Sequence, residues 1–329
     1  MNDYWLANPP FSARMTPMKQ NLIIGTRGSE LALAQSRLAV DAILAHYPGL
    51  QHELRIIHTA GDQRTDIPLH QVNTATQTGD KGVFIAAIEE ALAAGEIDCA
   101  VHSLKDMPGQ LDPRFEIAAI LPREDIADTL VVKKGADPHH LVIGTGSVRR
   151  AHFVRAYWGD SARCLPIRGN VSTRLRKLAE NPEMTATLLA RAGLNRLGHT
   201  GNTVQVGDES FCLVDLSPDA FMPALGQGAV AIEIRKGDEE IRRLVAPAND
   251  EATARCVAAE RAFLDALQAD CSVPVGGYAS EEVSGTLLLR ALYFTSGGQP
   301  IRITQRGPAS DPEAVGVAAH KQLMRKLEV

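Results

Sequence analysis

Cysteine is scarce in this sequence, and its arrangement excludes two common ways of stabilising a small domain. The 329 residues contain five cysteines, at positions 99, 164, 212, 256 and 271, and no two of them form a C-x-x-C motif. An odd, scattered set is not the pattern of a disulfide framework or of a structural zinc site. We therefore expect no bound metal and a reducing compartment, the cytoplasm.

Long apolar runs and a secretory leader are also missing. No stretch approaches the roughly 20 apolar residues that a membrane-spanning helix needs. The segment Met1–Pro10 carries an acidic residue and prolines where a secretory signal has basic and apolar residues. We expect a protein with no membrane partner, in which residues 1–19 form an extension ahead of the first strand.

A basic surplus and a phosphate-binding loop are missing as well. The 34 Lys and Arg against 39 Asp and Glu give a formal net charge of −5. Proteins that neutralise nucleic-acid phosphates usually carry a basic surplus, so a nucleic-acid partner is disfavoured. The motif G-x-x-x-x-G-K-[ST] does not occur, which excludes a Walker-type nucleotide site.

The sequence does contain a repeated alternation of short apolar runs and helical patterns. A strand at Asn21–Gly25 precedes a helix at Leu31–His46, and the pattern restarts with a strand at Leu141–Ile143 and a helix at Val148–Trp158. This alternation predicts parallel sheets with helices on both faces. The last 80 residues instead predict a helix, two strands and a final helix at Pro312–Leu327, which is typical of a small α+β domain.

These patterns predict an α/β protein with two lobes and a small α+β C-terminal domain. We expect a first domain made of residues 20–125 and 223–246, a second made of residues 126–222, and a third made of residues 247–329. The segment Gln71–Gly82, rich in Thr, Asn, Gln and Gly, predicts either a mobile lid or a plain solvated insertion.

Three predicted strands end in segments of similar composition that combine Gly, Ser or Thr, and Arg. They are GTRGS at 25–29, GTGSVRR at 144–150 and RGNVSTR at 168–174. Each places hydroxyls, backbone N–H groups and a guanidinium at a helix start, a combination that binds carboxylate or phosphate. At one site the hydroxyls could simply cap the helix. Three such sites favour a binding region for a small polyanion with several carboxylates.

Two further segments have both a structural and a chemical interpretation. The segment HSLKD, which includes Ser103, Lys105 and Asp106, follows a predicted buried strand. Asp106 either bonds to local backbone in a turn before Pro108 or acts as a catalytic carboxylate. A lone cysteine such as Cys271 is usually a small buried hydrophobe, so its position alone assigns it no role.

Together these segments resemble the porphobilinogen deaminase family of tetrapyrrole biosynthesis, whose members are also called hydroxymethylbilane synthases. The similarity runs from about Leu22 to the C-terminus. It is carried by GTRGSELALAQ (25–35), DKGVFIAAIEEAL (80–92), DCAVHSLKDMP (98–108), GTGSVRR (144–150), PIRGNVSTRLRKL (166–178), LLARAGLNRLG (188–198), LGQGAVAIE (225–233), AAERAFL (258–264) and CSVPVGGY (271–278). Several long motifs in one order are specific, whereas GQG alone would be weak.

The resemblance implies a fold and a reaction. Two lobes like those of periplasmic binding proteins precede a third domain, in which Cys271 holds a dipyrromethane cofactor through a thioether. Four porphobilinogen molecules are joined head to tail, each with loss of ammonia, and water then releases hydroxymethylbilane. The resemblance also implies a monomeric transferase.

The resemblance further implies a role for each matching residue. The catalytic carboxylate is Asp106. The cofactor-binding residues, besides Cys271, are Lys105, Ser103, Thr145, Ser147, Arg149 and Arg150. The substrate-binding residues are Arg27, Ser29, Gln35, Lys81, Arg168, Arg174 and Arg196. These residue types fit the chemistry, because the substrate carries two carboxylates and the loss of ammonia leaves an electron-poor pyrrole that a carboxylate stabilises.

Three positions depart from the family's pattern. Gln71 stands where a lysine is expected, and Gly146 stands where many relatives have a serine. Asp270 replaces a common glycine before the cofactor cysteine, where a negative charge disfavours the thiolate. Two alternatives to the enzyme remain open from the sequence: a two-lobed solute-binding protein that captures a polycarboxylate without chemistry, and an inactive relative.

Overall fold

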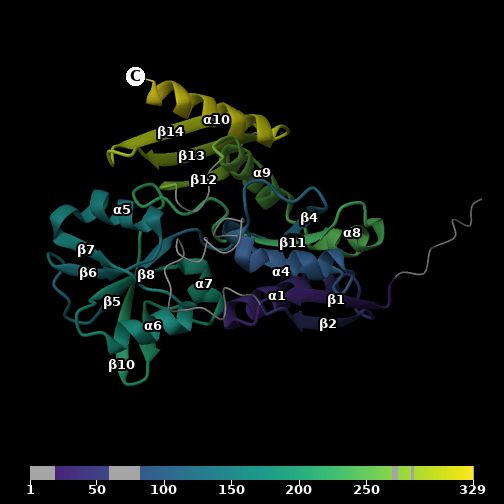
Figure 1. Ribbon diagram of the computed structural model, residues 1–329, viewed down its shortest axis with the longest axis horizontal. Coiled ribbons are helices and arrows are strands. Elements are labelled where there is room, and N and C mark those ends of the chain that lie inside the picture. Colours follow the sequence, from purple (N-terminus) through teal and green to yellow (C-terminus); the bar gives the residue numbers. More distant parts are fainter. Residues whose placement is uncertain (1–18, 59–81, 269–272, 283–284, 329) are drawn as a thin grey trace, which may run out of the picture.

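Three sheets organise the chain in the computed structural model, which describes residues 19–58, 82–268, 273–282 and 285–328 (Figure 1). The first sheet has the order β2 (Gln51–Ile56), β1 (Asn21–Thr26), β3 (Cys99–Ser103), β11 (Val230–Arg235) and β4 (Phe115–Ile120). The second has the order β7 (Ala162–Leu165), β6 (Leu141–Gly144), β8 (Ala186–Ala190), β5 (Asp128–Lys133), β10 (Glu209–Asp215) and β9 (Thr203–Val206). The third consists of β12 (Val275–Glu282), β13 (Thr286–Phe294) and β14 (Pro300–Pro308). We call the parts built on these sheets lobe 1, lobe 2 and the C-terminal domain, and they confirm the predicted fold class.

Both lobe sheets are mixed, which corrects the prediction of parallel sheets. In lobe 1, β1 runs parallel to β2 and β3, but β11 runs antiparallel to β3 and β4. In lobe 2, β6 runs parallel to β7 and β8, but β5 runs antiparallel to β8 and β10. The reason is that β5 and β11 are the strands that enter each lobe from the other, so no β-α-β crossover within one sheet forces them to be parallel.

Helices cover both faces of the lobe 1 sheet. Helix α1 (Glu30–Leu44) packs Ala39 and Ile43 on the face that carries Val101. Helix α4 (Gly82–Ala93) packs Ile88 on the opposite face, where Ala100 lies. Because neighbouring residues of β3 are buried on opposite faces, this strand is apolar throughout its first three residues, as a central strand covered on both sides should be.

The remaining helices are α5 (Val148–Trp158), α6 (Val171–Glu180), α7 (Arg191–Arg196), α8 (Glu239–Val245), α9 (Glu251–Ala266) and α10 (Pro312–Leu327). Of these, α8 packs against β4 and β11 of lobe 1, and the others belong to lobe 2 and the C-terminal domain. A short 3₁₀ turn, η1 (Leu104–Asp106), follows β3 directly. None of the helices in the described part of the chain is both long and apolar enough to cross a membrane.

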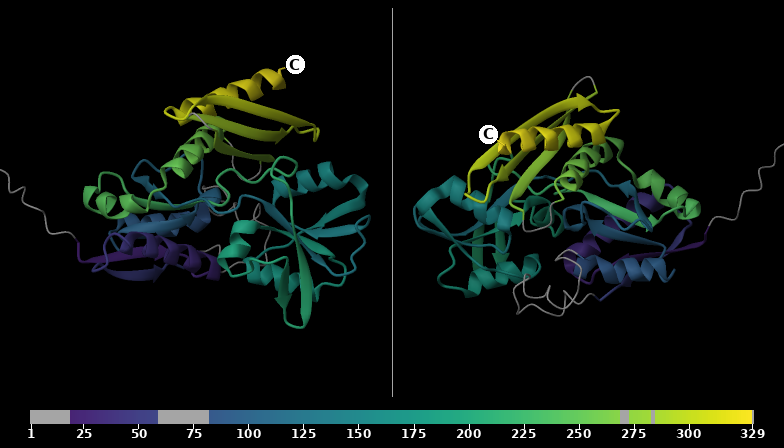
Figure 2. Two further views of the ribbon diagram at one scale, coloured as in Figure 1. Left: turned by 180° about the vertical axis from the view of Figure 1, so that it is seen from behind. Right: turned by 45° about the horizontal axis from the view of Figure 1, so that its top comes forward.

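The C-terminal domain lies over both lobes, as the views in Figures 1 and 2 show. Helices α9 and α10 pack against each other and against its sheet. The end of β13 enters the lobe 2 core, where the rings of Phe294 and Phe153 meet edge to face with centroids 5.0 Å apart. This contact fixes the C-terminal domain on lobe 2.

Strand β12 was not predicted, because its Gly276-Gly277 pair is typical of a loop. A Cβ on Gly276 would lie 2.7 Å from the carbonyl oxygen of Met222, and one on Gly277 would lie 2.7 Å from that of Arg290. The two glycines therefore allow close approach of backbone to β12 rather than a turn. The predicted extension and most of the segment Gln71–Gly82 lie outside the described residues.

Candidate active site

Each of the three Gly- and Arg-containing segments leads into a helix, as predicted, and a polar side chain caps that helix. Ser29 of α1, Ser147 of α5 and Asn170 of α6 each accept a hydrogen bond from a backbone N–H in the first turn, at 3.2, 3.3 and 2.8 Å. Capping explains the local conformation of these side chains. Anion binding by Ser29 and Ser147 stays a prediction.

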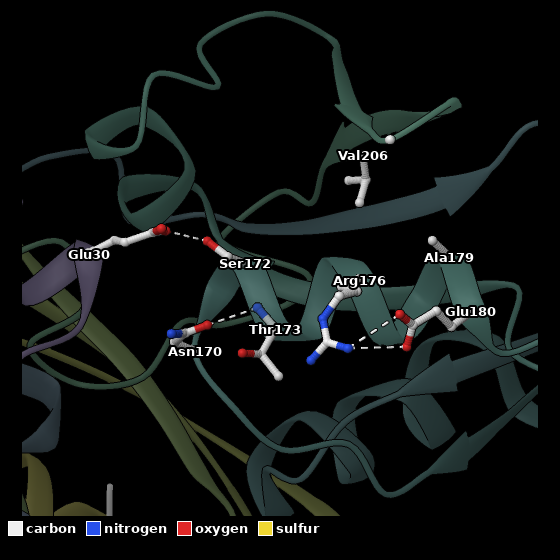
Figure 3. A pocket seen from close by; sticks show the side chains of 9 residues that line it. Glu30, Asn170, Ser172, Thr173, Arg176, Ala179, Glu180 and Val206 are labelled. Carbon is white, nitrogen blue, oxygen red and sulfur yellow. Dashed lines mark hydrogen bonds and ion pairs between the residues drawn. The ribbon is translucent and has the colours of Figure 1, made fainter.

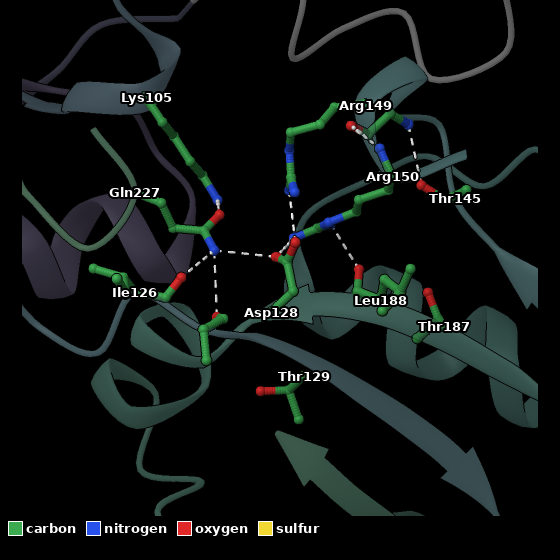
Figure 4. A network of polar contacts seen from close by, with 12 residues as sticks. Lys105, Ile126, Asp128, Thr129, Thr145, Arg149, Arg150, Thr187, Leu188 and Gln227 are labelled. Atoms are coloured by element: carbon green, nitrogen blue, oxygen red, sulfur yellow. Dashed lines mark hydrogen bonds and ion pairs between the residues drawn. The ribbon is translucent and has the colours of Figure 1, made fainter. Parts of the chain in front are cut away.

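The two arginines in the first turn of α5 share one buried carboxylate (Figure 4). Asp128, at the start of β5, is fully buried. Its Oδ2 accepts a hydrogen bond from Arg149 Nη2 and its Oδ1 accepts one from Arg150 Nη2, both at 2.7 Å. Arg149 also donates to the carbonyl oxygen of Met222 at 2.5 Å, and Arg150 donates to that of Leu188 at 2.7 Å.

This arrangement leaves positive charge that a bound anion could neutralise. Burial alone would raise the pKa of Asp128, but the charges of Arg149 and Arg150 outweigh it and hold that pKa well below its usual range. Two buried guanidinium groups therefore face one carboxylate. The Nε of Arg150 is buried and has no hydrogen-bond partner among the described residues.

Lys105 adds a third cation, which comes from lobe 1. Its Nζ donates to Gln227 Oε1 at 3.1 Å, and the amide of Gln227 in turn donates to Asp128 Oδ1 at 3.1 Å. Burial, and then the charge of Arg150, lower the pKa of Lys105 to about 8. We call this set the interlobe network: Lys105, Gln227, Asp128, Arg149 and Arg150.

Asp106 follows Lys105 in η1 and is exposed. Among the described residues, no group hydrogen-bonds to its carboxylate, so the structure does not show the bond to local turn backbone that is one of the two alternatives for Asp106. Its charge acts against the burial that lowers the pKa of Lys105, and it does the same for Arg174, whose pKa burial and Arg150 lower to about 10. Asp106 thus lies within electrostatic reach of two cations, and its oxygens are available to a ligand.

The other predicted cations of lobe 2 lie close to the same region. Arg174 Nε donates to the carbonyl oxygen of Gly169 at 2.8 Å, and the charge of Arg168 helps to lower the pKa of Arg174. Arg196 Nη2 donates to the carbonyl oxygen of Gly228 at 2.6 Å, and burial lowers its pKa. The structure therefore brings Arg168 and Arg174 near the interlobe network and ties Arg196 to the loop that contains Gln227.

The remaining predicted residues fall into two groups. The described ones are Arg27 after β1, buried Gln35 in α1, half-buried Ser103 at the end of β3, and buried Thr145 after β6. Cys271 and Lys81 lie outside the described residues. At Gly146, a Cβ would lie 2.9 Å from the carbonyl oxygen of Ile167, so a serine there would require this backbone to move.

The loop that contains Gln227 needs its two glycines. Gly226 and Gly228 have φ values of +76° and +87°, which L-residues rarely adopt. A Cβ on Gly228 would also lie 2.3 Å from the carbonyl oxygen of Glu124. The two glycines thus allow Gln227 to be placed between the lobes.

A second buried carboxylate joins the C-terminal domain to the same loop. Glu260 of α9 is fully buried and accepts hydrogen bonds from Arg123 Nη1 and Nη2 at 2.5 and 3.1 Å. It also accepts from the backbone N–H of Gly226 at 2.6 Å and from that of Ala279 at 2.7 Å. One carboxylate therefore joins both connections between the lobes to α9 and β12, the elements that flank the segment containing Cys271.

Four of these residues were not predicted from the sequence: Arg123, Asp128, Gln227 and Glu260. Asp128 opens a strand whose first four residues are buried, and an acidic residue in a buried strand signals that a cation must pair with it. Gln227 stands inside the GQG motif, which the sequence analysis used only to support a family resemblance. Nothing in the residues next to Arg123 or Glu260 in the sequence indicates that these two side chains pair with each other.

A pocket lies beside α6, and no residue of the interlobe network lines it (Figure 3). It is lined by Glu30, Asn170, Ser172, Thr173, Arg176, Ala179, Glu180, Val206 and Gly207. None of the predicted site residues lines it. Across one side of it, the hydroxyl of Ser172 in lobe 2 donates to the carboxylate of Glu30 in lobe 1, which gives a direct polar contact between the lobes.

Comparison with known proteins identifies the family. The family profile described as porphobilinogen deaminase, dipyromethane cofactor binding domain, matches residues 22–243, and that of the porphobilinogen deaminase C-terminal domain matches residues 254–325. The chain belongs to the porphobilinogen deaminase family. It is 43% identical over 311 residues to the porphobilinogen deaminase of Roseiflexus sp. (strain RS-1), covering 93% of this chain and 97% of that protein.

Other relatives agree with this assignment. Identity to the porphobilinogen deaminase of Natranaerobius thermophilus is 40% over 284 residues, covering 85% of this chain and 86% of that protein. Among solved structures, substrate-binding domain 2 of Lactococcus lactis GlnP is similar at 12% identity and a TM-score of 0.39, over 71% of this chain and 89% of that one. That similarity is too weak to add to the family assignment.

Family membership gives the chain its activity and its cofactor. It is a transferase that joins four porphobilinogen molecules head to tail with loss of ammonia on a dipyrromethane cofactor, and releases hydroxymethylbilane by hydrolysis. This assignment favours the enzyme over the solute-binding alternative. The porphobilinogen deaminase fold also explains why two α/β lobes are followed by a small third domain.

Proposed function

We propose that Asp106 is the catalytic carboxylate of this reaction and that the interlobe network, with the cations around it, holds the carboxylates of cofactor and growing chain. The observation that carries the proposal is the excess of cations. The interlobe network contains three cationic side chains and one carboxylate: Arg149 and Arg150 pair with Asp128, and Lys105 is linked to it through Gln227. Buried charge of one sign is costly unless a partner neutralises it, so the region favours a bound polyanion.

The proposed role of Asp106 follows from its surroundings. Its oxygens make no hydrogen bond to described groups, and its charge acts on the cations Lys105 and Arg174. An ionised carboxylate can accept the N–H of a pyrrole ring, stabilise a positive charge on that ring, and take up or return a proton. Loss of ammonia from porphobilinogen creates such a positive charge.

The basic residues are proposed to bind and orient the carboxylates of the cofactor, the substrate and the growing chain. Arg149, Arg150 and Lys105 are proposed to hold the carboxylates of the cofactor, together with the hydroxyls of Ser103, Thr145 and Ser147. A second group is proposed to bind the substrate and the growing chain: Arg27, Ser29, Gln35, Lys81, Arg168, Arg174 and Arg196. The forked guanidinium matches a carboxylate with two parallel hydrogen bonds, and each added pyrrole unit brings two carboxylates that need such partners.

Cys271 is proposed to carry the cofactor through a thioether. When bound, the dipyrromethane group supplies the pyrrole carbon to which the first substrate molecule is joined. Helix α9 ends at Ala266 and β12 begins at Val275, so Cys271 lies on the connection between them. Glu260 of α9 accepts hydrogen bonds from the backbone N–H groups of Gly226 and of Ala279 in β12, so both flanking elements are joined to the loop of Gln227.

The domain division proposed for this function has a first domain of residues 20–125 and 223–246, a second of residues 126–222 and a third of residues 247–329. It is supported by the position of β11 in the lobe 1 sheet. We further propose that the enzyme acts as a monomer in the cytoplasm on the small molecule porphobilinogen, without nucleic-acid or membrane partners.

Intact-mass measurement of the purified protein tests the cofactor attachment. We expect an excess over the sequence mass equal to two linked pyrroles, and we expect its loss in Cys271→Ser. The matched control is Cys212→Ser, at a half-buried cysteine of β10 in lobe 2, which should keep the full excess. An active wild-type protein without excess mass, or loss of the excess in the control alone, would refute the attachment to Cys271.

A further inference from the structure

Gln227 lies where the chain passes from lobe 2 back to lobe 1. It is fully buried, and Gly226 and Gly228 on either side of it have positive φ angles. Strand β11 begins three residues after Gln227, at Val230. A polar side chain without any exposed surface must have all its hydrogen-bonding groups satisfied inside the protein.

The surroundings of the Gln227 amide fix its orientation. Its Nε2 donates to the carbonyl oxygens of Ile126 and Ala127 at 2.8 and 3.3 Å and to Asp128 Oδ1 at 3.1 Å. A flipped amide would place its oxygen against these three oxygens, with no donor between them. The Nε2 end therefore faces lobe 2, and Oε1 must face the opposite way.

Lys105 Nζ lies on that opposite side, 3.1 Å from Gln227 Oε1. Among the described residues this oxygen is the one hydrogen-bond acceptor of the amine. The charges of Arg149 and Arg150 act against the protonated amine, while those of Asp106 and Asp128 favour it. A lysine side chain is long and flexible, so without the acceptor nothing in this set would hold its amine at one point.

We propose that Gln227 is a positioning residue that holds the amine of Lys105 in register with the arginines of lobe 2. The amide is itself held by backbone and carboxylate oxygens of lobe 2, whereas Lys105 belongs to lobe 1. Gln227 thus sets the spacing between the Lys105 amine and the guanidinium groups of Arg149 and Arg150. This inference rests on the binding role proposed above for Lys105.

A double-mutant cycle tests the proposal, with Gln227→Met and Lys105→Met, because methionine keeps the length of each side chain and removes its polar end. In the wild-type background, Gln227→Met should lower kcat/KM for porphobilinogen about 10- to 100-fold, the effect expected for a hydrogen bond to a charged group. In the Lys105→Met background the same change should alter kcat/KM less than about twofold, because no amine is left to position.

Thermal unfolding and a control variant distinguish a positioning role of Gln227 from a general structural role. The thermal unfolding midpoint should fall in both backgrounds, because the bonds to Ile126 and Asp128 are lost in each, and it should fall further in the wild-type background, where the bond to Lys105 is lost as well. The control Gln205→Met removes an exposed glutamine of β9 that donates to the Gly207 carbonyl oxygen, and it should leave kcat/KM unchanged. Equal losses of kcat/KM in both backgrounds would overturn the proposal.

If Lys105→Met is as active as wild type, the proposed binding role of Lys105 is refuted. The positioning role of Gln227 can still be tested by a measurement that does not depend on activity. Trace acetylation across a pH series, read peptide by peptide by mass spectrometry, gives the titration midpoint of Lys105. In wild type we expect a midpoint of about 8. In Gln227→Met it should fall, because a hydrogen bond to the charged form is lost, and a rise would show that the amine has moved into solvent. An unchanged midpoint would overturn the role of Gln227.

Discussion

The change Asp128→Asn should destabilise the protein far more than its small size suggests. Both oxygens of Asp128 accept hydrogen bonds from buried guanidinium groups, one from Arg149 and one from Arg150, each at 2.7 Å. Asparagine keeps the shape but has one oxygen and one N–H₂ group, so one arginine meets a donor in place of an acceptor. Both arginines also lose the counter-charge that they share.

The magnitude follows from burial. Removing one partner of a buried ion pair costs about 3–5 kcal/mol, because the charge left behind has no compensation. For cooperative unfolding of a chain of this length, this corresponds to a fall in Tm of about 4–7 °C. The matched control is Asp137→Asn, which removes an ion pair to His140 that is exposed on both sides. It should change Tm by about 1 °C or less.

Thermal unfolding followed by circular dichroism across pH checks this reasoning. The pKa of Asp128 is depressed in the folded state, so its stabilising contribution is complete above the unfolded pKa of about 4 and is lost as pH falls further. The difference between wild type and Asp128→Asn should thus be constant from pH 5 to 8 and shrink below pH 4. A Tm within about 1 °C of wild type at pH 7 would refute the claim that Asp128 compensates the two arginines.

Two further predictions concern the residues of η1. Asp106→Asn should lower kcat about 10²- to 10⁴-fold in steady-state assays. Its Tm in unfolding curves should be nearly unchanged, because Asp106 is exposed and makes no hydrogen bond to described groups. A kcat within tenfold of wild type would exclude the catalytic role. The pKa of Lys105 lies near 8, so kcat/KM for porphobilinogen should fall as pH increases through 8, whereas Lys105→Arg, which stays charged, should keep a flat kcat/KM to pH 9.5. A parallel fall of kcat/KM in both enzymes would assign the pH dependence to another group. In the window between pH 8 and the unfolded lysine pKa of about 10.4 the unfolded chain binds more protons, so the contribution of Lys105 to stability should increase with pH there.

The sequence predicts elements best where local signals mark both ends. The bounds predicted for α5 and α10 match the observed helices, and each helix follows a capping residue, Ser147 or Asp311. Such caps act within one turn of the chain, so they can be read without knowledge of the fold. Strand β12 fails the same test, because its glycines serve close packing against backbone from elsewhere in the chain.

The residues of the candidate site also differ in whether the sequence around them predicts their role. Arg149 and Arg150 could be predicted as members of a charged region from the residues around them. Their carboxylate, Asp128, could not, because it comes from another strand, and Gln227 follows Asp128 only after the whole of lobe 2. Partners that meet through the tertiary fold leave no spacing in the sequence, so the excess of positive charge became visible only in three dimensions.

The position of β11 has a consequence for the order in which the protein can fold. This strand lies between β3 and β4, yet the whole of lobe 2 precedes it in the chain. During synthesis, the facing edges of β3 and β4 therefore have no partner until lobe 2 has left the ribosome, a delay of roughly 5–20 s at about 5–20 residues per second. Unpaired edges invite wrong pairing in that interval. Of the two lobes, lobe 1 is the first to be started and the last to be completed. A nascent chain that stalls within lobe 2 therefore exposes unpaired strand edges of lobe 1, which can pair with other chains and aggregate.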